Sequence, residues 1–223
     1  MPKVNHTALP IGRVLLTRPV EKNLAQAQQL AAHGYDYISY PLIHVTPLND
    51  QNLTNKLAQS DIIIAVSANA IVSANAQITQ WPNKTYYAVG NATAEAFHRL
   101  NIQAIVPGDP RTEGLLSLDT LQQLSDKNVL ILRGNGGRED LAIQLKNRGA
   151  NVVYSELYQR ETVFHAKNTV KQWRQQGITT IVVTSAQILQ NLIALINDGN
   201  QAWLGQVTLI VPSVRVANIA HKY

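Results

Sequence analysis

The sequence predicts an α/β protein built from two parallel sheets. Short apolar runs rich in β-branched residues alternate with segments of helical periodicity along the whole chain, and such alternation is typical of parallel sheets. An internal repeat is the second observation, since a duplicated unit predicts two similar sheets. The expected strands are, in order, residues 14–17, 35–40, 62–66, 86–89, 102–106, 129–132, 152–155, 180–184 and 207–211.

The repeat relates two strand–helix–strand units that lie 115 residues apart (129 − 14). Arg18 matches Arg133 directly after the first strand of each copy. Gly34 matches Gly149 at the end of each helix, where glycine tolerates the left-handed conformation that closes a helix. Each copy then continues into a second strand.

The two copies differ in length. The first copy goes on to an expected strand at residues 102–106 and a helix-like segment at 112–116, whereas the second copy stops at Tyr223. We therefore expect a C-terminal strand and helix to be missing and one edge of the second sheet to be exposed.

The composition is typical of globular proteins and excludes several classes of function. It has 223 residues, 45% apolar and 15% charged, enough for one large or two small domains. It contains no cysteine, so thiol catalysis, disulfides and cysteine-ligated zinc are excluded. No run approaches the ~20 apolar residues of a membrane span, and residues 1–7 lack the apolar core of a signal peptide. We expect a cytoplasmic protein without a membrane partner.

The net charge of +5 suits an acidic partner. The 19 basic residues are scattered, whereas nucleic-acid-binding proteins concentrate theirs in a run or a stripe. Aromatic residues make up only 6% of the chain, so a stacking platform for single strands is poorly supplied. We therefore expect a polyanionic small molecule and no nucleic acid.

Most expected strands run into a polar residue and then into a helix. Ser, Thr, Asn, Gly and Arg at these points would cap the helices, and in an open parallel sheet they would share the edge where ligands bind. Helix N-termini there attract anions through free N–H groups and the helix dipole. Two such edges would suit a ligand with several carboxylates or phosphates. Candidate ligands from this pattern are Arg18, Ser67, Arg133, Arg138, Ser213 and Arg215.

A glycine-rich turn, which contains Gly134, Asn135 and Gly136, follows one expected strand. The dinucleotide fingerprint G-x-G-x-x-G would need glycine at Glu139, where the helix must pack closely. Glu156 stands about 20 residues on, where such sites carry an acidic residue, but this match does not restore the motif. No Gly-Lys-Ser/Thr follows, so a P-loop is excluded. The turn indicates an anion site, with a dinucleotide disfavoured.

The usual catalytic groups are sparse. The six histidines show no metal-ligand spacing, no G-x-S-x-G marks a serine nucleophile, and the few acidic residues form no obvious pair at a strand end. We therefore expect no metal and no cofactor. A reaction at this edge would depend on positioning of the substrate and on one mild proton donor.

Taken in order, these motifs resemble those of the uroporphyrinogen-III synthase family. The matching segments are residues 15–19, 40–42, 88–94, 113–116, 131–161, 183–185 and 213–217, which span nearly the whole chain. The resemblance implies two flavodoxin-like α/β domains joined by a two-stranded β ladder. Domain 1 would combine residues 1–40 with 164–223, domain 2 would span 46–154, and the ladder would pair 40–46 with 155–163. The residues by themselves would predict two tandem domains.

The resemblance also implies a lyase of porphyrin and heme biosynthesis. Members of the family close hydroxymethylbilane, a linear tetrapyrrole with eight carboxylates, into uroporphyrinogen III in a cleft between two domains. They invert the terminal pyrrole ring and use no cofactor. Tyr158 matches the tyrosine thought to donate a proton as the substrate loses its hydroxyl. Thr93 and Ser185 match hydroxyls of the family's cleft, whereas Val216 stands where the family has a threonine.

With this substrate, the glycine-rich turn is expected to offer its amides to carboxylates. We expect a monomer that receives its substrate from the preceding pathway enzyme by a transient hand-over. The family also continues with one more strand and helix past the position of Tyr223. One alternative stays open, in which two lobes form a polycarboxylate-binding or sensing module without turnover.

Overall fold

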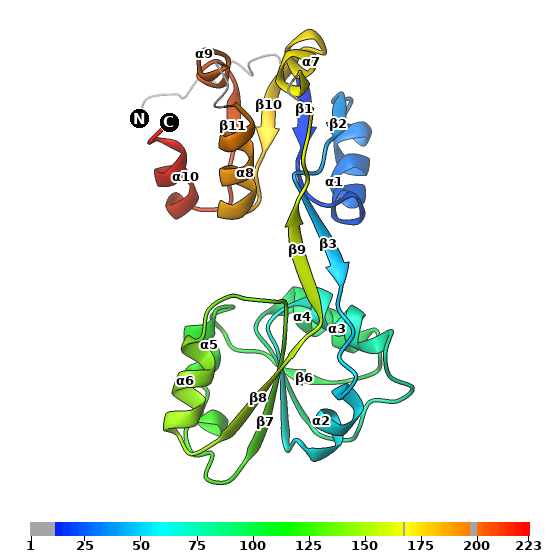
Figure 1. Cartoon of the computed structure of the whole chain (residues 1–223), viewed down its shortest axis with the longest axis vertical. Helices are drawn as coiled ribbons and strands as arrows, with labels where there is room; N and C mark the ends of the chain where they lie inside the picture. Colours follow the sequence, from blue (N-terminus) through cyan, green and yellow to red (C-terminus); the bar gives the residue numbers. More distant parts are fainter. Residues whose placement is uncertain (1–11, 167, 197–199) are drawn as a thin grey trace, which may run out of the picture. The chain divides into compact units, whose positions relative to one another are not determined.

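The computed structural model describes residues 12–166, 168–196 and 200–223, and the chain divides into two compact units (Figure 1). Unit 1 comprises residues 1–44 and 161–223, and unit 2 comprises residues 45–160. Residues 1–7, which carry the argument against a signal peptide, lie outside the described part. Within the described part, none of the helices is both long and apolar enough to cross a membrane.

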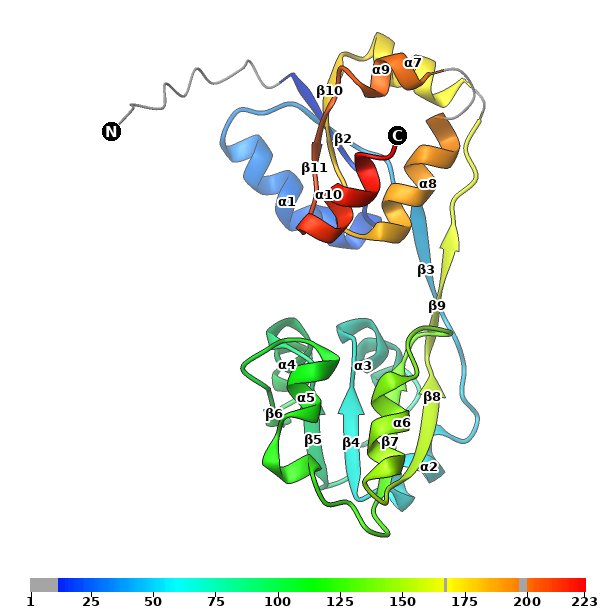
Figure 2. The same ribbon diagram turned by 90° about the vertical axis from the view of Figure 1, so that its left-hand side faces the viewer.

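Unit 2 is built on a sheet of five parallel strands in the order β6-β5-β4-β7-β8 (Figure 2). The strands are β4 (Ile62–Ala65), β5 (Thr85–Ala88), β6 (Ala104–Ile105), β7 (Asn128–Arg133) and β8 (Asn151–Glu156). The central strands β4 and β7 are apolar runs because both faces of the sheet are covered. Ile63 and Ile64 point to opposite faces, and both are fully buried.

Helices cover each face of this sheet (Figure 1). One face carries α2 (Leu53–Gln59), α3 (Ala68–Asn75) and α4 (Asn91–His98), and the other carries α5 (Thr112–Leu116), the 3₁₀ helix η1 (Asp119–Leu121) and α6 (Asp140–Asn147). Ile71 of α3 and Phe97 of α4 pack on the side of Ile63. Leu145 of α6 packs on the side of Ile64. Burial of each such side chain stabilises the unit by roughly 1.5–3 kcal/mol, which fixes the helices on the strands that precede them.

Unit 1 has four parallel strands in the order β11-β10-β1-β2. They are β1 (Arg13–Leu16), β2 (Tyr37–Ser39), β10 (Ile178–Val182) and β11 (Thr208–Ile210). The helices are α1 (Val20–Ala32) on one face and α7 (Thr169–Gln175), α8 (Ala186–Ile196), α9 (Gln201–Leu204) and α10 (Val214–Ala220) on the other (Figure 1). Helix α8 buries Leu189, Leu192 and Ile196, whose spacing defines one apolar stripe.

The two sheets share one strand order. Numbered from the first strand of each repeat copy, β1 or β7, both read 2-1-3-4, and β6 adds a fifth strand in unit 2. This is the order of flavodoxin-like folds, which confirms the predicted fold class and explains the repeat. The matched glycines have the same conformation, because Gly34 has φ +73° and Gly149 has φ +92°, each directly after the C-cap residue of α1 or α6. Tyr35 N and Ala150 N then close the helices with bonds to Leu30 O and Leu145 O.

A separate two-stranded sheet pairs β3 (Ile43–Pro47) with β9 (Tyr158–Thr162), as Figure 2 shows. At one end Val163 N donates to Leu42 O at 3.2 Å, and at the other Leu48 N donates to Leu157 O at 2.9 Å. The strands therefore run antiparallel. They are the expected ladder, and β9 follows β8 after Leu157 alone.

Candidate active site

In flavodoxin-like sheets, ligands bind at the carboxyl ends of the strands, beside the point where the strand order reverses. That point lies between β4 and β7 in unit 2 and between β1 and β10 in unit 1. In unit 2, Ser67 follows β4 and the glycine-rich turn follows β7. In unit 1, Arg18 follows β1 and Ser185 follows β10. Ser67, the glycine-rich turn, Arg18 and Ser185 therefore lie beside the points where the strand order reverses.

The turn after β7 requires its glycines for two different reasons. Gly136 and Gly137 have φ +67° and +112°, in the left-handed region that disfavours other residues. Gly134 is needed for space, because a Cβ there would lie 2.6 Å from Cζ of Tyr158. The hydroxyl-bearing end of that ring therefore rests on the backbone of the turn.

Arg133, expected as a substrate ligand, is buried with 4% of its surface exposed. Its Nε donates to Gly134 O at 3.2 Å, its Nη2 donates to Gly136 O, and its Nη1 donates to Glu139 Oε1 at 2.8 Å. Its Cζ also lies 4.6 Å from the ring centre of Tyr154. These contacts hold the turn in shape from within.

Glu139 occupies the position where a dinucleotide site would need glycine. Its carboxylate accepts hydrogen bonds from Arg133 and Tyr154. Tyr154 donates to Glu139 Oε2 at 2.5 Å, and this bond, together with that from Arg133, holds the pKa of Glu139 below its usual value. Burial and the neighbouring Glu139 raise the pKa of Tyr154 to about 12. Glu139 therefore links Arg133 and Tyr154 in one hydrogen-bonded network.

Glu156 binds the turn with both carboxylate oxygens. Gly136 N lies 3.2 Å from Oε1, and Asn135 Nδ2 lies 2.6 Å from Oε2. In the sequence, Glu156 matched only the acidic residue of a dinucleotide site, whereas in the structure its carboxylate binds the turn. The amide donors of the turn thus hold a carboxylate, which stands in for the kind of group that they were expected to bind.

Tyr158 begins β9 and is 3% exposed. Its main-chain oxygen accepts from Asn135 N at 2.6 Å, which ties the strand to the turn. Its hydroxyl accepts from Nη2 of Arg160 at 3.1 Å. The phenol, the Arg160 guanidinium and the carboxylate-binding turn therefore form one cluster in unit 2.

The remaining candidates of unit 2 follow the neighbouring strands β4, β5 and β7. Ser67 Oγ accepts from Asn69 N at 3.2 Å, so it caps α3. Thr93 is buried in the first turn of α4. Arg138 is exposed and bonds to Asp140 at 2.8 Å and to Glu113 at 3.3 Å. Such exposed ion pairs are worth little, so Arg138 can exchange them for another anion.

The strand ends of unit 1 are tied together by polar side chains. Thr17 Oγ1 donates to Val182 O at 2.6 Å, which joins β1 to β10. Buried Asn23 donates to Arg18 O at 2.9 Å and to Ser39 Oγ at 2.8 Å, and so holds the loop after β1 against β2. The guanidinium of Arg18 has no hydrogen bond or ion pair with any described residue.

The other candidates of unit 1 begin helices. Ser185 Oγ accepts from Ile188 N at 3.2 Å, and Ser213 Oγ accepts from Val216 N at 3.4 Å, so both cap a helix. Arg215 is exposed on the first turn of α10. The hydroxyls can still donate to an acceptor, because capping uses only their lone pairs.

Two features of the cluster in unit 2 were not predicted from the sequence. They are the position of Arg160 beside Tyr158 and the binding of the turn by Glu156. A signal for Arg160 existed, since residues two apart on a strand share a face and Arg160 follows Tyr158 by two. For Glu156, the pairing Arg133↔Glu156 at the ends of β7 and β8 brings the carboxylate to the turn. That register is not visible in the sequence.

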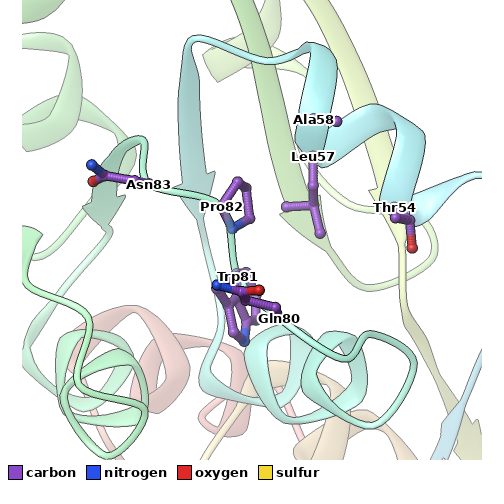
Figure 3. A pocket seen from close by; sticks show the side chains of 7 residues that line it. All are labelled: Thr54, Leu57, Ala58, Gln80, Trp81, Pro82 and Asn83. Carbon is purple, nitrogen blue, oxygen red and sulfur yellow. The ribbon is translucent and has the colours of Figure 1, made fainter.

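A cavity of about 330 Å³ in unit 2 contains none of the expected site residues (Figure 3). Its lining is Thr54, Leu57, Ala58, Gln80, Trp81, Pro82 and Asn83. These residues precede β4 and β5, so the cavity lies at the amino ends of the strands, opposite the edge that holds the turn. No group of three or more His, Asp or Glu in the described ranges is placed to hold a metal ion.

This chain is similar to known proteins along nearly its whole length. The family model for uroporphyrinogen-III synthase HemD matches residues 25–223. The uroporphyrinogen-III synthase of Salmonella typhimurium is 36% identical and that of Escherichia coli 35%, each over 94% of this chain and 90% of the relative. The relatives therefore correspond to this chain over nearly its full length.

Solved structures of uroporphyrinogen III synthases have the same fold. A mutant from Thermus thermophilus superposes with a TM-score of 0.66 at 13% identity, over 95% of this chain and 88% of the other. The Helicobacter pylori protein gives a TM-score of 0.55 at 14% identity, over 95% and 99%. At these identities the solved structures establish the fold alone. Because the family model and relatives above 30% identity cover most of the chain, the chain belongs to the uroporphyrinogen-III synthase family.

Proposed function

We propose that this chain is a lyase that closes hydroxymethylbilane into uroporphyrinogen III and inverts the terminal pyrrole ring. The observation that carries the proposal is the cluster in unit 2. There a glycine-rich turn already binds a carboxylate, that of Glu156, and the phenol end of Tyr158 rests on the same turn at Gly134. A polycarboxylate substrate held at the turn would bring its reacting end to a proton donor.

Tyr158 is the proposed general acid. The hydroxyl of the substrate leaves as water only if it gains a proton, and a positioned side chain that supplies it accelerates such a step about 10²–10⁴-fold. Ring closure then releases one proton from the attacked pyrrole, which restores the phenol. Water is the only by-product, so the reaction needs no oxidant and no reductant.

The substrate carboxylates are proposed to bind at the carboxyl ends of the strands. In unit 2 the ligands are Ser67, Thr93, Arg138 and the turn of Gly134, Asn135 and Gly136, whose shape Arg133 maintains. In unit 1 they are Arg18, Ser185, Ser213 and Arg215. Arg18, whose guanidinium has no partner among the described residues, and the exposed Arg215 support this assignment, since both have cationic donors to offer a carboxylate.

A binding or sensing module without turnover, the alternative left open by the sequence, is not favoured, because the matching family and relatives are synthases. We further propose that the protein acts in the cytoplasm as a monomer. Transient hand-over from the enzyme that makes hydroxymethylbilane would limit spontaneous closure of the substrate. Light scattering after size-exclusion chromatography, alone and with that enzyme, measures both the monomer and the complex.

Product isomer analysis tests the proposed function. Freshly generated hydroxymethylbilane is mixed with the protein, and the porphyrins are separated after oxidation. Mostly type III isomer supports the proposal. Type I isomer alone, formed at the rate seen without protein, contradicts it.

A further inference from the structure

Arg160 lies beside the phenol of Tyr158. Its Nη2 is 3.1 Å from the Tyr158 hydroxyl oxygen, and its Cζ is 5.5 Å from the ring centre. Both side chains belong to β9, where residues two apart point to the same face. The strand itself therefore brings the cation to the phenol.

The contact excludes one direction for the phenolic proton, because Arg160 cannot accept it. A guanidinium has only donors, so Tyr158 must be the acceptor and its own proton is not used there. Close packing on Gly134 restrains the ring, and the bond from Asn135 N to the main-chain oxygen of Tyr158 at 2.6 Å holds the backbone that carries it. The proton of Tyr158 is left for another acceptor.

The neighbouring phenol of Tyr154 shows the opposite arrangement. It donates its proton to Glu139 at 2.5 Å, and the same guanidinium that binds Glu139 stacks on its ring. Burial and Glu139 raise the pKa of Tyr154 to about 12, so this phenol keeps its proton. Within one cluster, Tyr154 is paired with a carboxylate and Tyr158 with a cation.

We infer that Arg160 is a positioning residue that fixes Tyr158 as the proton donor of the reaction. The proton passes from the phenol to the leaving oxygen of the substrate, the C–O bond breaks, and water leaves. The negative charge stays on the Tyr158 oxygen, and the bond from Arg160 becomes stronger because it then joins two opposite charges. The inference rests on the proposed function and adds Arg160 to the residues that act with Tyr158.

A double-mutant cycle tests the inference. Single-turnover and steady-state rates of type III formation are measured for wild type, Arg160→Met, Tyr158→Phe and the double variant. We expect Arg160→Met to lower kcat about tenfold with little change in KM, since it loses a bond that strengthens in the transition state. In the Tyr158→Phe background, which lacks the phenol oxygen, the same substitution is expected to change nothing.

Two variants act as controls. Arg160→Lys keeps a cationic donor and should recover most of kcat. Arg99→Met removes one exposed positive charge from the end of α4 in the same unit and should leave both constants unchanged. A rise in KM alone, or an equal loss of kcat in the wild-type and Tyr158→Phe backgrounds, would show that Arg160 binds substrate or shapes the strand, and would overturn the inference.

A measurement without turnover keeps the inference separate from the proposed function. Protein labelled with ¹³C at Cζ of tyrosine is compared between wild type and Arg160→Met, with Tyr158→Phe used to assign the signal. We expect the Tyr158 signal to shift and the Tyr154 signal to stay in place. An unmoved Tyr158 signal would remove the hydrogen bond on which the inference depends, whatever product the wild type forms.

Discussion

The carboxylate of Glu156 is bound by Gly136, whose main-chain nitrogen lies 3.2 Å from Oε1. Asn135 holds the second oxygen at 2.6 Å, so the turn is filled by a group of the protein itself. A substrate carboxylate that uses these donors must displace Glu156. Glu156, which lies two residues before Tyr158, would then move when substrate binds.

Glu156→Gln should therefore lower KM. A neutral amide keeps the size of the side chain but accepts more weakly, and the difference of about 1 kcal/mol between charged and neutral hydrogen bonds corresponds to about fivefold in KM. Asp119→Asn, which removes an exposed charge from η1, is the matched control. If Glu156→Gln instead raises KM and lowers the melting temperature, the carboxylate shapes the turn and does not compete with substrate.

Gly134→Ala should separate activity from stability. The added Cβ would lie 2.6 Å from Cζ of Tyr158, so the phenol must shift, and misplacement of a reacting group can cost about 100-fold in kcat. The loss of stability should stay within about 1–3 kcal/mol, because a single methyl is added against a side chain. Gly108→Ala is the control, since a Cβ there meets nothing within 4 Å. Unchanged kcat in Gly134→Ala would argue against Tyr158 as the proton donor.

Arg18 and Arg133 match each other in the repeat, but their substitution by methionine should affect different properties, KM for Arg18 and stability for Arg133. Arg133→Met leaves the carbonyls of Gly134 and Gly136 without their donor and should lower the free energy of unfolding by about 2 kcal/mol. Arg18→Met should change it by less than about 0.5 kcal/mol and raise KM about tenfold. Urea unfolding and steady-state kinetics measure the two effects. Equal destabilisation by both would contradict the assignment.

Asp50 should make the stability of unit 2 depend on acid pH. Burial alone would raise the pKa of Asp50, but hydrogen bonds from Lys56 at 2.7 Å and Ser155 at 2.7 Å outweigh it and hold that pKa below 3.8. The folded state thus binds this proton less readily than the unfolded state. The stabilisation is complete above the unfolded pKa and disappears as the pH falls through the lower folded value.

Urea unfolding of wild type and Asp50→Asn from about pH 6 to pH 3 checks this expectation. Near pH 6 the variant should be less stable by about 2 kcal/mol, the scale of hydrogen bonds to a charged group. The gap should narrow as the pH falls below 3.8. A gap that stays constant across the range would mean that the charge of Asp50 contributes nothing.

The centres of both sheets could be predicted from the sequence because they are apolar on both faces. The run at residues 62–66 is β4 in the sheet of unit 2, and that at 14–17 is β1 in the sheet of unit 1. The ladder strands β3 and β9 gave no such signal, since β9 reads Tyr-Gln-Arg-Glu-Thr and buries little beyond Tyr158. The apolar content of β9 is too low to form a run, and only the family resemblance predicted the ladder.

The candidate site was predictable in position and less so in detail. Four arginines were treated alike as charges near strand ends, yet Arg133 is buried and Arg18 has no described partner. The difference comes from Gly136 and Glu139, which meet Arg133 only after the turn has folded back on itself. Contacts of this kind depend on the left-handed conformation of the turn, which spacing in the sequence does not specify.

The insertion of unit 2 between β2 and β10 has a consequence for the order of folding. Leu15 of β1 pairs with Ile181 of β10, so unit 1 must close a loop of 166 residues (181 − 15). Unit 2 supplies 116 of them (160 − 45 + 1), and once it has folded with β3 against β9 the open loop falls to about 50 residues. The shorter loop lowers the entropy of closure by about 1 kcal/mol. During synthesis, residues 45–160 are also complete before β10 is made, so we expect the inserted unit to fold first and the two segments of unit 1 to join afterwards.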